Sequence, residues 1–526
     1  MECTNSIKII NTQYSKTNYG SCLNKAIMIT TRATSERQSE LEIYFSKFRK
    51  HIVGIDQEFE SPYGTKKMIY TDWTASGRLY RPIEEKLLNQ FGPFVANTHT
   101  ETTVSGTAMT NAYHKARNII KGHVNTNADD VLIVAGNGMT SVVNKFQRIL
   151  GLKVPENLRK YATIPYEIRP VVFVTHMEHH SNHTSWLETM AKVEVIPAGD
   201  DGLFSIQNLE ILLEEYKDCA LKIASVIGGS NVTGIQTPYH EIAKVMHKHG
   251  GVCFVDFACS APYVDINMHP ENEEEALDAI FFSPHKFLGG PGTSGVLVFN
   301  KKLYKNMIPD CPGGGTVSWT NPWGEHKYIE SIEDREDGGT PGFLQTIKTA
   351  LAIRLKEEMG VKNILNREHE LLHQVFKNLG AINNIKILAP NEQDRLGVIS
   401  FYIEDLHFNL GVKILNDRFG IQTRGGCSCA GTYGHYLLNV DREKSNALTC
   451  EITSGDLTHK PGWIRMSIHP TTTCNEIDYV CDSLIALAEN HIEWSKDYEY
   501  NKANNEFIHK TFVPSQELRV DGWFEL

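Results

Sequence analysis

One lysine, Lys286, stands where an apolar run gives way to a glycine-rich turn. Residues 279–282 are apolar, the turn 288–295 contains four glycines, and a second apolar run spans 296–299. The pattern predicts a strand, a loop and a second strand, with the lysine at the exit of the first strand. Apolar neighbours would leave its ammonium group poorly hydrated, so we expect a lowered pKa and an amine that attacks carbonyl carbons. We interpret Lys286 as a Schiff-base lysine for pyridoxal phosphate, the alternative being a solvated loop lysine.

A second motif predicts a phosphate site. An apolar run, 131–135, continues into the turn 136–141 (GNGMTS) and then into a helical pattern. Such a turn presents free backbone N–H groups and the positive end of a helix dipole to an anion. The spacing fits neither a dinucleotide fingerprint nor a nucleotide P-loop, so we expect this turn to bind one phosphate monoester, or else to be an ordinary strand-to-helix turn. Thr316, at the end of a triple-glycine turn, is a further candidate for a phosphate contact.

Four histidines follow the apolar run 171–175, within the segment 176–183 (HMEHHSNH). They invite a zinc interpretation, but the segment supplies no cysteine ligand and lacks the spacing of a zinc hydrolase, so we expect no metal. A flat cofactor could instead stack on one of the rings. The other interpretation is a polar surface loop.

An acidic residue, Asp256, ends another apolar run, 252–255. A buried carboxylate needs a cationic or hydrogen-bonding partner. A protonated pyridine nitrogen is such a partner, and the aspartate would keep that ring an effective electron sink. A helix cap or an ion pair with an arginine are the alternatives.

The C-terminal part carries a Cys-x-Cys pair, Cys427 and Cys429, in a glycine turn that follows Arg424. We favour a reactive thiol, because a glycine turn exposes sulfur and a nearby arginine favours the thiolate. Half of a metal site or two inert small residues are the alternatives. Arg465 lies within an apolar run, which indicates a carboxylate partner, either a substrate or a buried structural ion pair.

The elements that must position these residues alternate between strands and helices. This alternation predicts an α/β fold with a parallel sheet, whose ligands lie at the carboxyl ends of the strands. The candidates at such ends are Gly138, His179, Asn231, Asp256 and Lys286. From residue 385 the sequence pattern changes to one that predicts short strands and helices. We therefore expect an N-terminal extension (1–45), a large cofactor-binding domain (46–345), a smaller α/β domain (346–495) and a tail (496–526).

The composition narrows the class of protein. The 526 residues are 41% hydrophobic and carry a net charge of −11, which argues against a general nucleic-acid or anionic-membrane binder. The 11 cysteines have no regular spacing, which favours a reducing compartment over a disulfide framework. There is no apolar run of about 18 residues, so we expect no membrane span and a cytoplasmic protein. Residues 1–45 form either a poorly ordered extension or a weak organelle-targeting segment.

Taken together, the motifs resemble the class V aminotransferase family of fold-type-I pyridoxal-phosphate enzymes, and within it the cysteine desulfurase and selenocysteine lyase branch. The likeness runs from about residue 70 to 487. It is most specific at 178–182 (EHHSN), 255–256 (VD), 283–286 (SPHK) and 424–430 (RGGCSCA). The resemblance implies a large, mostly parallel sheet of the seven-stranded type with a smaller C-terminal α/β domain.

The resemblance also implies a role for each matching residue. By it, Lys286 holds the cofactor aldehyde and moves protons, Asp256 pairs with the pyridine nitrogen, and His179 stacks on the ring. Arg465 would clamp the substrate carboxylate, with Arg424 nearby, and Cys429 would form a persulfide. The remaining cofactor contacts that it implies are Met139, Thr140, Asn231, Cys259, Ser283 and His285.

Two positions depart from the family pattern. Cys259 stands three residues after Asp256, where the family often has a glutamine that contacts the phenolic oxygen of the cofactor. The branch commonly shows Arg-Thr-Gly-His-His-Cys, whereas this chain has Arg-Gly-Gly-Cys-Ser-Cys at 424–429, which is also similar to molybdenum-cofactor sulfurases. Either Cys427 or Cys429 is therefore a candidate for the reactive thiol.

The resulting hypothesis is a cysteine desulfurase-like enzyme that converts an amino acid substrate, cysteine, to alanine and an enzyme persulfide. The resemblance implies a homodimer and allows for a protein that accepts the sulfur. The alternatives are a class V aminotransferase, an epimerase or another lyase without persulfide chemistry, and a non-catalytic protein that uses the fold for binding.

Overall fold

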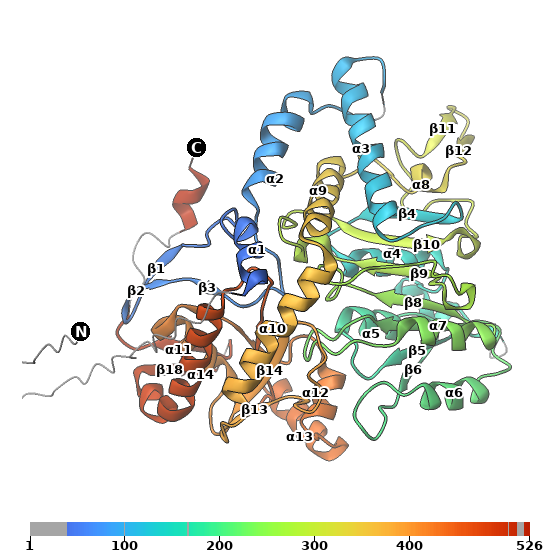
Figure 1. Cartoon of the computed structure of the whole chain (residues 1–526). Coiled ribbons are helices and arrows are strands. Elements are labelled where there is room, and N and C mark those ends of the chain that lie inside the picture. The colour runs from blue at the N-terminus through green and yellow to red at the C-terminus, as the bar shows by residue number, and fades with distance from the viewer. Residues whose placement is uncertain (1–38, 99, 166–167, 503, 513–519, 526) are drawn as a thin grey trace, which may run out of the picture. The chain divides into compact units, whose positions relative to one another are not determined.

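The computed structural model describes residues 39–98, 100–165, 168–502, 504–512 and 520–525 (Figure 1). A compact unit begins at Ser39, so residues 39–45 of the expected extension belong to it. The expectations for residues 1–38 lie outside the described part. Helix α1 (Glu40–Arg49) begins at Ser39, whose side chain caps it by accepting from the backbone N–H of Glu42.

The central element is a seven-stranded sheet in the order β4-β10-β9-β8-β7-β5-β6. β10 is antiparallel to β4 and β9, and the other neighbours are parallel. The strands are β4 (Asp130–Ala135), β5 (Val171–Thr175), β6 (Lys192–Ile196), β7 (Lys222–Ile227), β8 (Val252–Asp256), β9 (Ala279–Phe282) and β10 (Gly295–Asn300). The mostly parallel sheet expected from the alternation of strands and helices is confirmed.

Helices cover both faces of this sheet, which explains why its strands are apolar runs rather than alternating patterns. In β10, Val296 and Val298 contribute to the core on one face, whereas Leu297 and Phe299 contribute to the core on the other. The helices on the first face are α3 (Val104–His123), α6 (Ile206–Glu215), α7 (Tyr239–Lys248) and α9 (Phe343–Met359). Those on the second are α4 (Met139–Ile149) and α5 (His180–Leu187).

A smaller antiparallel sheet follows, in the order β13-β14-β17-β16. Its strands are β13 (Ile385–Ile387), β14 (Val398–Ile403), β16 (Arg424–Gly426) and β17 (Trp463–Ser467). Its core includes residues of α10 (Val361–Leu379), α11 (Phe408–Phe419) and α14 (Cys474–Trp494). Two further helices, α12 (Gly431–Leu437) and α13 (Arg442–Thr453), lie between β16 and β17 in the sequence.

The boundaries between these parts differ from the expected ones. Helix α9 packs Ala352 and Ile353 into the core of the main sheet, although the boundary expected after residue 345 assigns it to the smaller domain. The helical pattern is continuous across the break at Gly360, so the sequence does not mark it. In the expected tail, β18 (Tyr498–Asn501) and β19 (Glu506–His509) form a hairpin whose Tyr498 belongs to the core of the smaller sheet.

The remaining elements are short. They comprise α2 (Arg81–Lys86), α8 (Ile332–Arg335), β1 (Glu58–Ser61), β2 (Gly64–Lys67), β3 (Ile69–Tyr70), β11 (Val317–Thr320), β12 (His326–Tyr328) and β15 (Ile421–Gln422). β3 pairs in parallel with β15, which joins the segment before the main sheet to the smaller sheet region.

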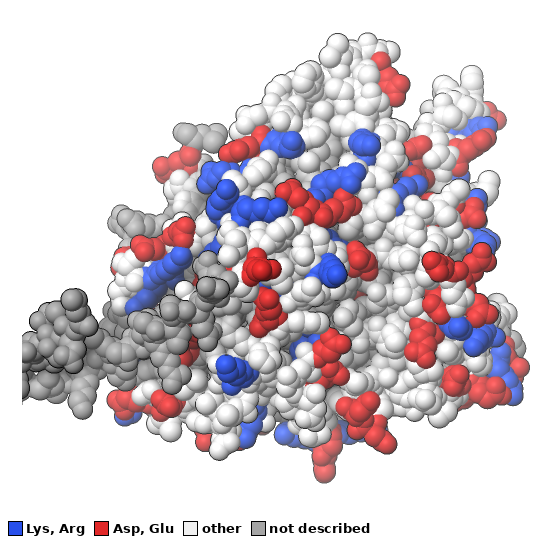
Figure 2. Space-filling view, viewed as in Figure 1, with Lys and Arg blue, Asp and Glu red and all other residues white. Residues whose placement is uncertain are grey.

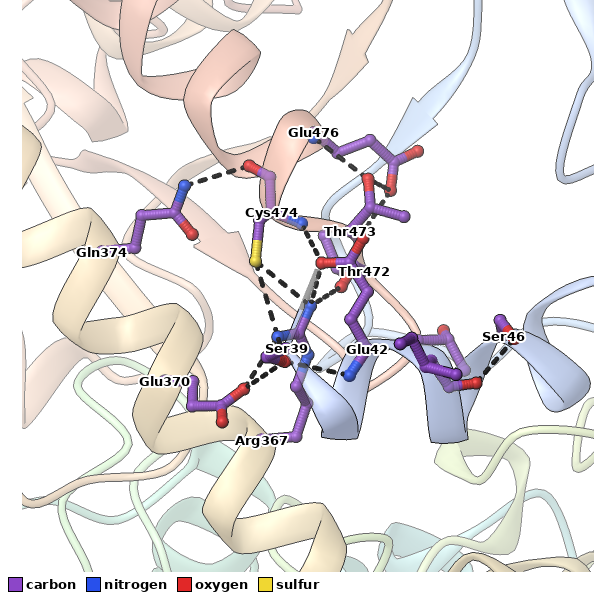
Figure 3. A network of polar contacts seen from close by, with 12 residues as sticks. Ser39, Glu42, Ser46, Arg367, Glu370, Gln374, Thr472, Thr473, Cys474 and Glu476 are labelled. Carbon is purple, nitrogen blue, oxygen red and sulfur yellow. Dashed lines mark hydrogen bonds and ion pairs between the residues drawn. The ribbon is translucent and has the colours of Figure 1, made fainter. Parts of the chain in front are cut away.

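A buried polar network fastens α1 to α10 and α14 (Figure 3). Arg367 of α10 is fully buried, and it donates to the carboxylate of Glu42 at 2.9 Å and to the carbonyl of Thr472 at 3.0 Å. The same oxygen of Glu42 accepts from the backbone N–H of Cys474 at 2.9 Å. Because each charged group has a partner of opposite sign or a hydrogen bond, the network ties the first helix to the smaller domain.

The face drawn in Figure 2 shows no large field of one charge. On the face drawn in Figure 2, basic and acidic side chains are interspersed. Among the described residues, no helix has the length and hydropathy that crossing a lipid bilayer requires.

Candidate active site

A cavity of about 160 Å³ lies at the carboxyl ends of the main-sheet strands. It receives residues from β8, the β9–β10 loop, the start of α4 and α5, the segment before α2, and the smaller sheet. Its lining is Thr74, Ala75, Asn137, Met139, Thr140, His179, Ser181, Ile227, Asn231, Asp256, Ala258, Cys259, Ser283, His285, Lys286, Arg424, Ser428, Cys429 and Arg465. The location agrees with the general rule that open α/β sheets bind ligands at this edge.

Lys286 ends a single 3₁₀ turn (Pro284–Lys286) directly after β9. The loop is close-packed, because a Cβ added to Gly290 would lie 1.9 Å from the carbonyl oxygen of Pro284. The N–H of Gly77 also donates to the carbonyl of His285 at 2.9 Å. Burial lowers the pKa of Lys286, while Cys259 and Asp256 oppose that shift. The half-buried amine therefore faces the cavity and has the lowered basicity that the sequence predicts.

Asp256 is the last residue of β8 and is 1% exposed. Its Oδ1 accepts from the backbone N–H of Ala258 at 2.8 Å. Burial raises the pKa of its carboxyl to about 6, although this N–H and the charge of Lys286 favour the anion. No ion pair links Asp256 to an arginine within the described residues, so its acidic group remains available to a cationic group in the cavity.

His179 is the N-cap of α5, where its Nδ1 accepts from the backbone N–H of Ser181 at 3.1 Å. Burial, assisted by the charge of Lys286, lowers the pKa of His179 to about 3. The ring is therefore neutral, with its hydrogen on Nε2. It lines the cavity as an uncharged flat surface, which is the form suited to stacking.

Glu178, next to His179, is fully enclosed between strand ends. Its carboxylate accepts from the N–H and hydroxyl of Thr175 at 3.3 and 2.7 Å, from the side chain of Asn182 at 2.8 Å and from the N–H of Ile227 at 2.8 Å. Burial raises the pKa of Glu178 to about 8, but all four contacts are donors, so, unlike a buried carboxyl without partners, this group is bound as the anion. The carboxylate joins β5, β7 and α5 beneath His179, a role that the sequence motif alone does not reveal.

The start of α4 has the features of an anion site. Gly138 adopts φ 107°, the helix has no side-chain cap, and its first N–H, on Met139, donates to Ser283 Oγ at 2.8 Å. The hydroxyls of Thr140 and Ser181 are 2.6 Å apart. The space is small, because a Cβ on Gly138 would lie 3.0 Å from Ser283 Oγ. An uncapped helix end surrounded by hydroxyl groups fits a phosphate monoester.

Arg465 lies in the centre of β17 and is 3% exposed. It forms a structural ion pair and also lines the cavity, so its contacts agree with both expected alternatives, a buried ion pair and a substrate site. Its Nη2 donates to Asp72 Oδ1 at 2.6 Å, and its Nη1 donates to the carbonyl of Asn231 at 3.2 Å. Its Nε and the Oδ1 of Asn231 are buried without a hydrogen-bond partner among the described residues. Both Nη groups thus have partners within the protein, whereas Nε, unpartnered among the described residues, is available to an anion.

The structure separates the two cysteines of the Cys-x-Cys pair. Cys429 lines the cavity, whereas Cys427 packs at the margin of a hydrophobic cluster with Ala430, Tyr433 and Trp463. Of this pair, Cys429 is therefore the one that shares the cavity with Lys286.

The lining includes all but three of the expected site residues. Gly138 forms the turn before the lining residue Met139, and Cys427 packs as described. Thr316 is buried away from the cavity, because its hydroxyl donates to the carbonyl of Gly313 at 2.6 Å and closes the triple-glycine turn on itself. Cys259 is enclosed beside Lys286, and burial raises the pKa of its thiol to about 11, so it is a neutral group there.

Sequence reasoning missed the contribution of the segment 72–75 (DWTA). It supplies Asp72, the partner of Arg465, and the lining residues Thr74 and Ala75. Thr74 Oγ1 is buried with no hydrogen-bond partner among the described residues. Small residues after a short strand could have indicated that the backbone approaches a ligand there. They could not have indicated that Asp72 pairs with Arg465.

Residues 69–480 match the family model of class-V aminotransferases. The chain belongs to this family. Among curated relatives of this class-V aminotransferase, a probable cysteine desulfurase of Halalkalibacterium halodurans is 29% identical over 380 residues, which are 72% of this chain and 86% of that protein. A probable cysteine desulfurase of Staphylococcus aureus is 28% identical over 372 residues, which are 69% and 84% of the two chains.

Solved structures share the fold of this class-V aminotransferase. A cysteine desulfurase from Thermococcus onnurineus NA1 superimposes with a TM-score of 0.67 at 22% identity, covering 84% of this chain and 98% of that one. The cysteine desulfurase CsdA from Escherichia coli gives a TM-score of 0.64 at 20% identity, covering 85% and 98%. The expected fold class and the expected membership of an enzyme family are confirmed.

Proposed function

We propose that this member of the class-V aminotransferase family is a cysteine desulfurase that uses pyridoxal phosphate. The observation that carries the proposal is the convergence of three groups on one cavity: the amine of Lys286, the carboxyl of Asp256 and the thiol of Cys429. An amine of lowered pKa and a buried acid suit the cofactor. A thiol in the same cavity suits a substrate that carries sulfur.

The residues present fit the cofactor. The uncapped start of α4, with Ser283 and Thr140, would hold its phosphate, His179 would stack on its ring, and Asp256 would pair with its ring nitrogen. Bound there, pyridoxal phosphate would supply an electron sink for bonds at the α-carbon of an amino acid.

The substrate would be an amino acid held by its carboxylate. Arg465 and Asn231 both line the cavity. The unpartnered Nε of Arg465 would donate to the substrate carboxylate, and the unpartnered amide oxygen of Asn231 would accept from the substrate amine. Lys286, whose pKa burial lowers, is the group that takes the α-proton and returns a proton to the product.

Sulfur transfer would use the thiolate of Cys429. It forms an S–S bond with the substrate sulfur, and the Cβ–S bond breaks with its electron pair left on Cβ, which then takes a proton. A thiol and cysteine become a persulfide and alanine, so the step needs no external oxidant or reductant.

Purified protein incubated with pyridoxal phosphate, cysteine and dithiothreitol tests the proposal. We expect equal amounts of alanine and sulfide, and a mass increase of one sulfur atom at Cys429 when the dithiol is omitted. Cys429→Ala should lose sulfide production. Cys427→Ala, the matched control for a thiol outside the cavity, should retain it.

Two results would contradict the proposal. If Cys429→Ala releases sulfide at the wild-type rate, the persulfide step is wrong. If cysteine is inert while another amino acid is converted to its 2-oxo acid, the protein is an aminotransferase instead.

We also propose that the enzyme works as a homodimer and passes its sulfur to an acceptor protein. Exposed apolar side chains on the β11–β12 hairpin support an assembly, because Trp319 is 47% and Trp323 84% exposed. Light scattering should give twice the mass of 59.3 kDa. Trp323→Lys should lower that mass toward the single chain, and an unchanged dimer would place the interface elsewhere.

A further inference from the structure

The loop that carries Cys429 has an unusual backbone. It joins β16 to α12, and the two consecutive residues Ser428 and Cys429 have φ 51° and 56°. This left-handed region is disfavoured for residues with a Cβ, so such a conformation persists only where the surroundings hold it. The surroundings of Cys429 therefore contain groups that fix its position.

One residue, His180, holds the loop at Cys429 and at the second residue after it. The backbone N–H of His180 donates to the carbonyl oxygen of Cys429 at 2.7 Å, and the N–H of Gly431 donates to Nε2 of the His180 ring at 2.9 Å. His180 is the first residue of α5 and follows His179, which lines the cavity. The cavity and the thiol loop are thus attached to the same helical turn.

Two further contacts hold Ser428 but do not reach Cys429. The side chain of Asn231 donates to the carbonyl of Ser428 at 2.7 Å, and Trp463 Nε1 donates to its hydroxyl at 3.2 Å. Asn231 thus holds the backbone directly before Cys429, whereas His180 holds the carbonyl of Cys429 itself and the N–H two residues after it.

The ring of His180 must be neutral to make its contact. Because the N–H of Gly431 donates to Nε2, that nitrogen carries a lone pair and the ring hydrogen is on Nδ1. Burial, with the charge of Lys460 as a smaller contribution, lowers the pKa of His180, which keeps the ring in this form.

We propose that His180 is a positioning residue for Cys429: it holds the thiol loop against α5, so that the sulfur faces the cavity without a loop closure. The inference deepens the proposed function and rests on it for the sulfur-transfer step. The hydrogen bonds themselves do not depend on that step, so part of the test is independent of it.

Two substitutions separate the contacts. His180→Ala removes the ring but keeps the backbone N–H. His180→Pro removes both, and the site accepts proline, because it is the first position of the helix and His179 before it has φ −66° and ψ 147°. His180→Gln restores an acceptor for Gly431 and should rescue the alanine variant. His183→Ala is the matched control, since the one hydrogen bond of that ring within the described residues goes to the side chain of Thr432.

The first measurement is the rate of Cys429 alkylation by iodoacetamide in the holoenzyme without substrate, followed by mass spectrometry. The second is persulfide formation at Cys429 in a single turnover with cysteine. Loss of one hydrogen bond should slow persulfide formation roughly 3- to 10-fold in His180→Ala, and loss of two should slow it further in His180→Pro. Alkylation should become faster in the same order, because a released loop exposes the sulfur.

Opposite changes in the two rates, restored by His180→Gln and absent in His183→Ala, support the proposal. A general loss of folding would also speed the alkylation of the buried Cys253, which the same mass spectra report. Wild-type rates of both reactions in His180→Ala and His180→Pro overturn it. If the wild-type enzyme forms no persulfide, the proposed function fails, and the alkylation rates alone still decide whether His180 holds the loop.

Discussion

Glu368 offers a sharp test of the electrostatics of the interior. It lies on α10 and is 1% exposed, and neither carboxyl oxygen has a hydrogen-bond partner among the described residues. Burial raises the pKa of its carboxyl from the usual 4.5 to about 8, opposed only by the nearby backbone N–H of Gly397. The carboxyl is therefore neutral in the folded protein at neutral pH.

The sign of the pH effect follows from proton binding. Between pH 4.5 and about 8 the folded state holds a proton on Glu368 that the unfolded state has released. The stability that this group contributes is fully present below pH 4.5 and is lost as the pH rises toward 8. The pKa difference, at about 1.36 kcal/mol per pH unit, gives an upper limit of about 5 kcal/mol for this loss.

Glu368→Gln should remove the pH dependence without changing the shape of the side chain. We expect the variant to match the wild type in thermal stability near pH 5 and to exceed it increasingly up to pH 8.5. Melting temperatures of both proteins, measured by fluorescence from pH 5 to 9, give the comparison. Glu358→Gln on α9 is the control, since that side chain is exposed and its substitution should have no pH-dependent effect.

The opposite outcome would refute the reasoning. If Glu368→Gln is less stable than the wild type at every pH, the native carboxyl is an anion held by hydrogen bonds. If the difference between the two proteins does not change between pH 5 and 9, the carboxyl does not titrate in this range.

Three further predictions concern the active site. Lys286→Ala should lower alanine formation by about 10²- to 10⁴-fold, as expected for loss of the group that moves protons, and retention of turnover would exclude this role. Asp72→Asn should lower kcat/KM for cysteine by roughly 10-fold or more, mainly through KM, because Arg465 loses a charge-assisted bond of 2.6 Å; an unchanged KM would show that Asp72 does not orient it. Glu178→Gln places an amide N–H₂ group among four donors, so the melting temperature should fall by the equivalent of about 1–3 kcal/mol, and an equal or higher value would mean that the native group is protonated.

The strand ends were predictable because their chemistry is local. A strand buried on both faces is an apolar run, and the first polar residue after it marks the edge of the sheet. Asp256, His179 and Lys286 each follow such a run, and the parallel arrangement then brings the three to one edge. The type of residue at each end was enough to suggest the cofactor.

The sequence narrowed the reactive thiol to two candidates but did not choose between them. The sequence offers Cys427 and Cys429 two residues apart in one turn, with nothing local to choose between them. In the structure, Ser428 and Cys429 have a left-handed backbone, the carbonyl of Cys429 accepts from the N–H of His180, and Cys429 lines the cavity.

The sequence by itself determined the fold class and suggested the cofactor and the strand ends that would bind it, since these follow from apolar patterns and the residues that interrupt them. Tertiary structure alone decided the pairing of Arg465 with Asp72, 393 positions away, and the turning of Thr316 onto its own loop rather than toward the cavity. The contact between Arg465 and Asp72 joins two segments whose sequence patterns are independent of each other. The packing of the two sheets, and no local preference, brings them within the length of a hydrogen bond.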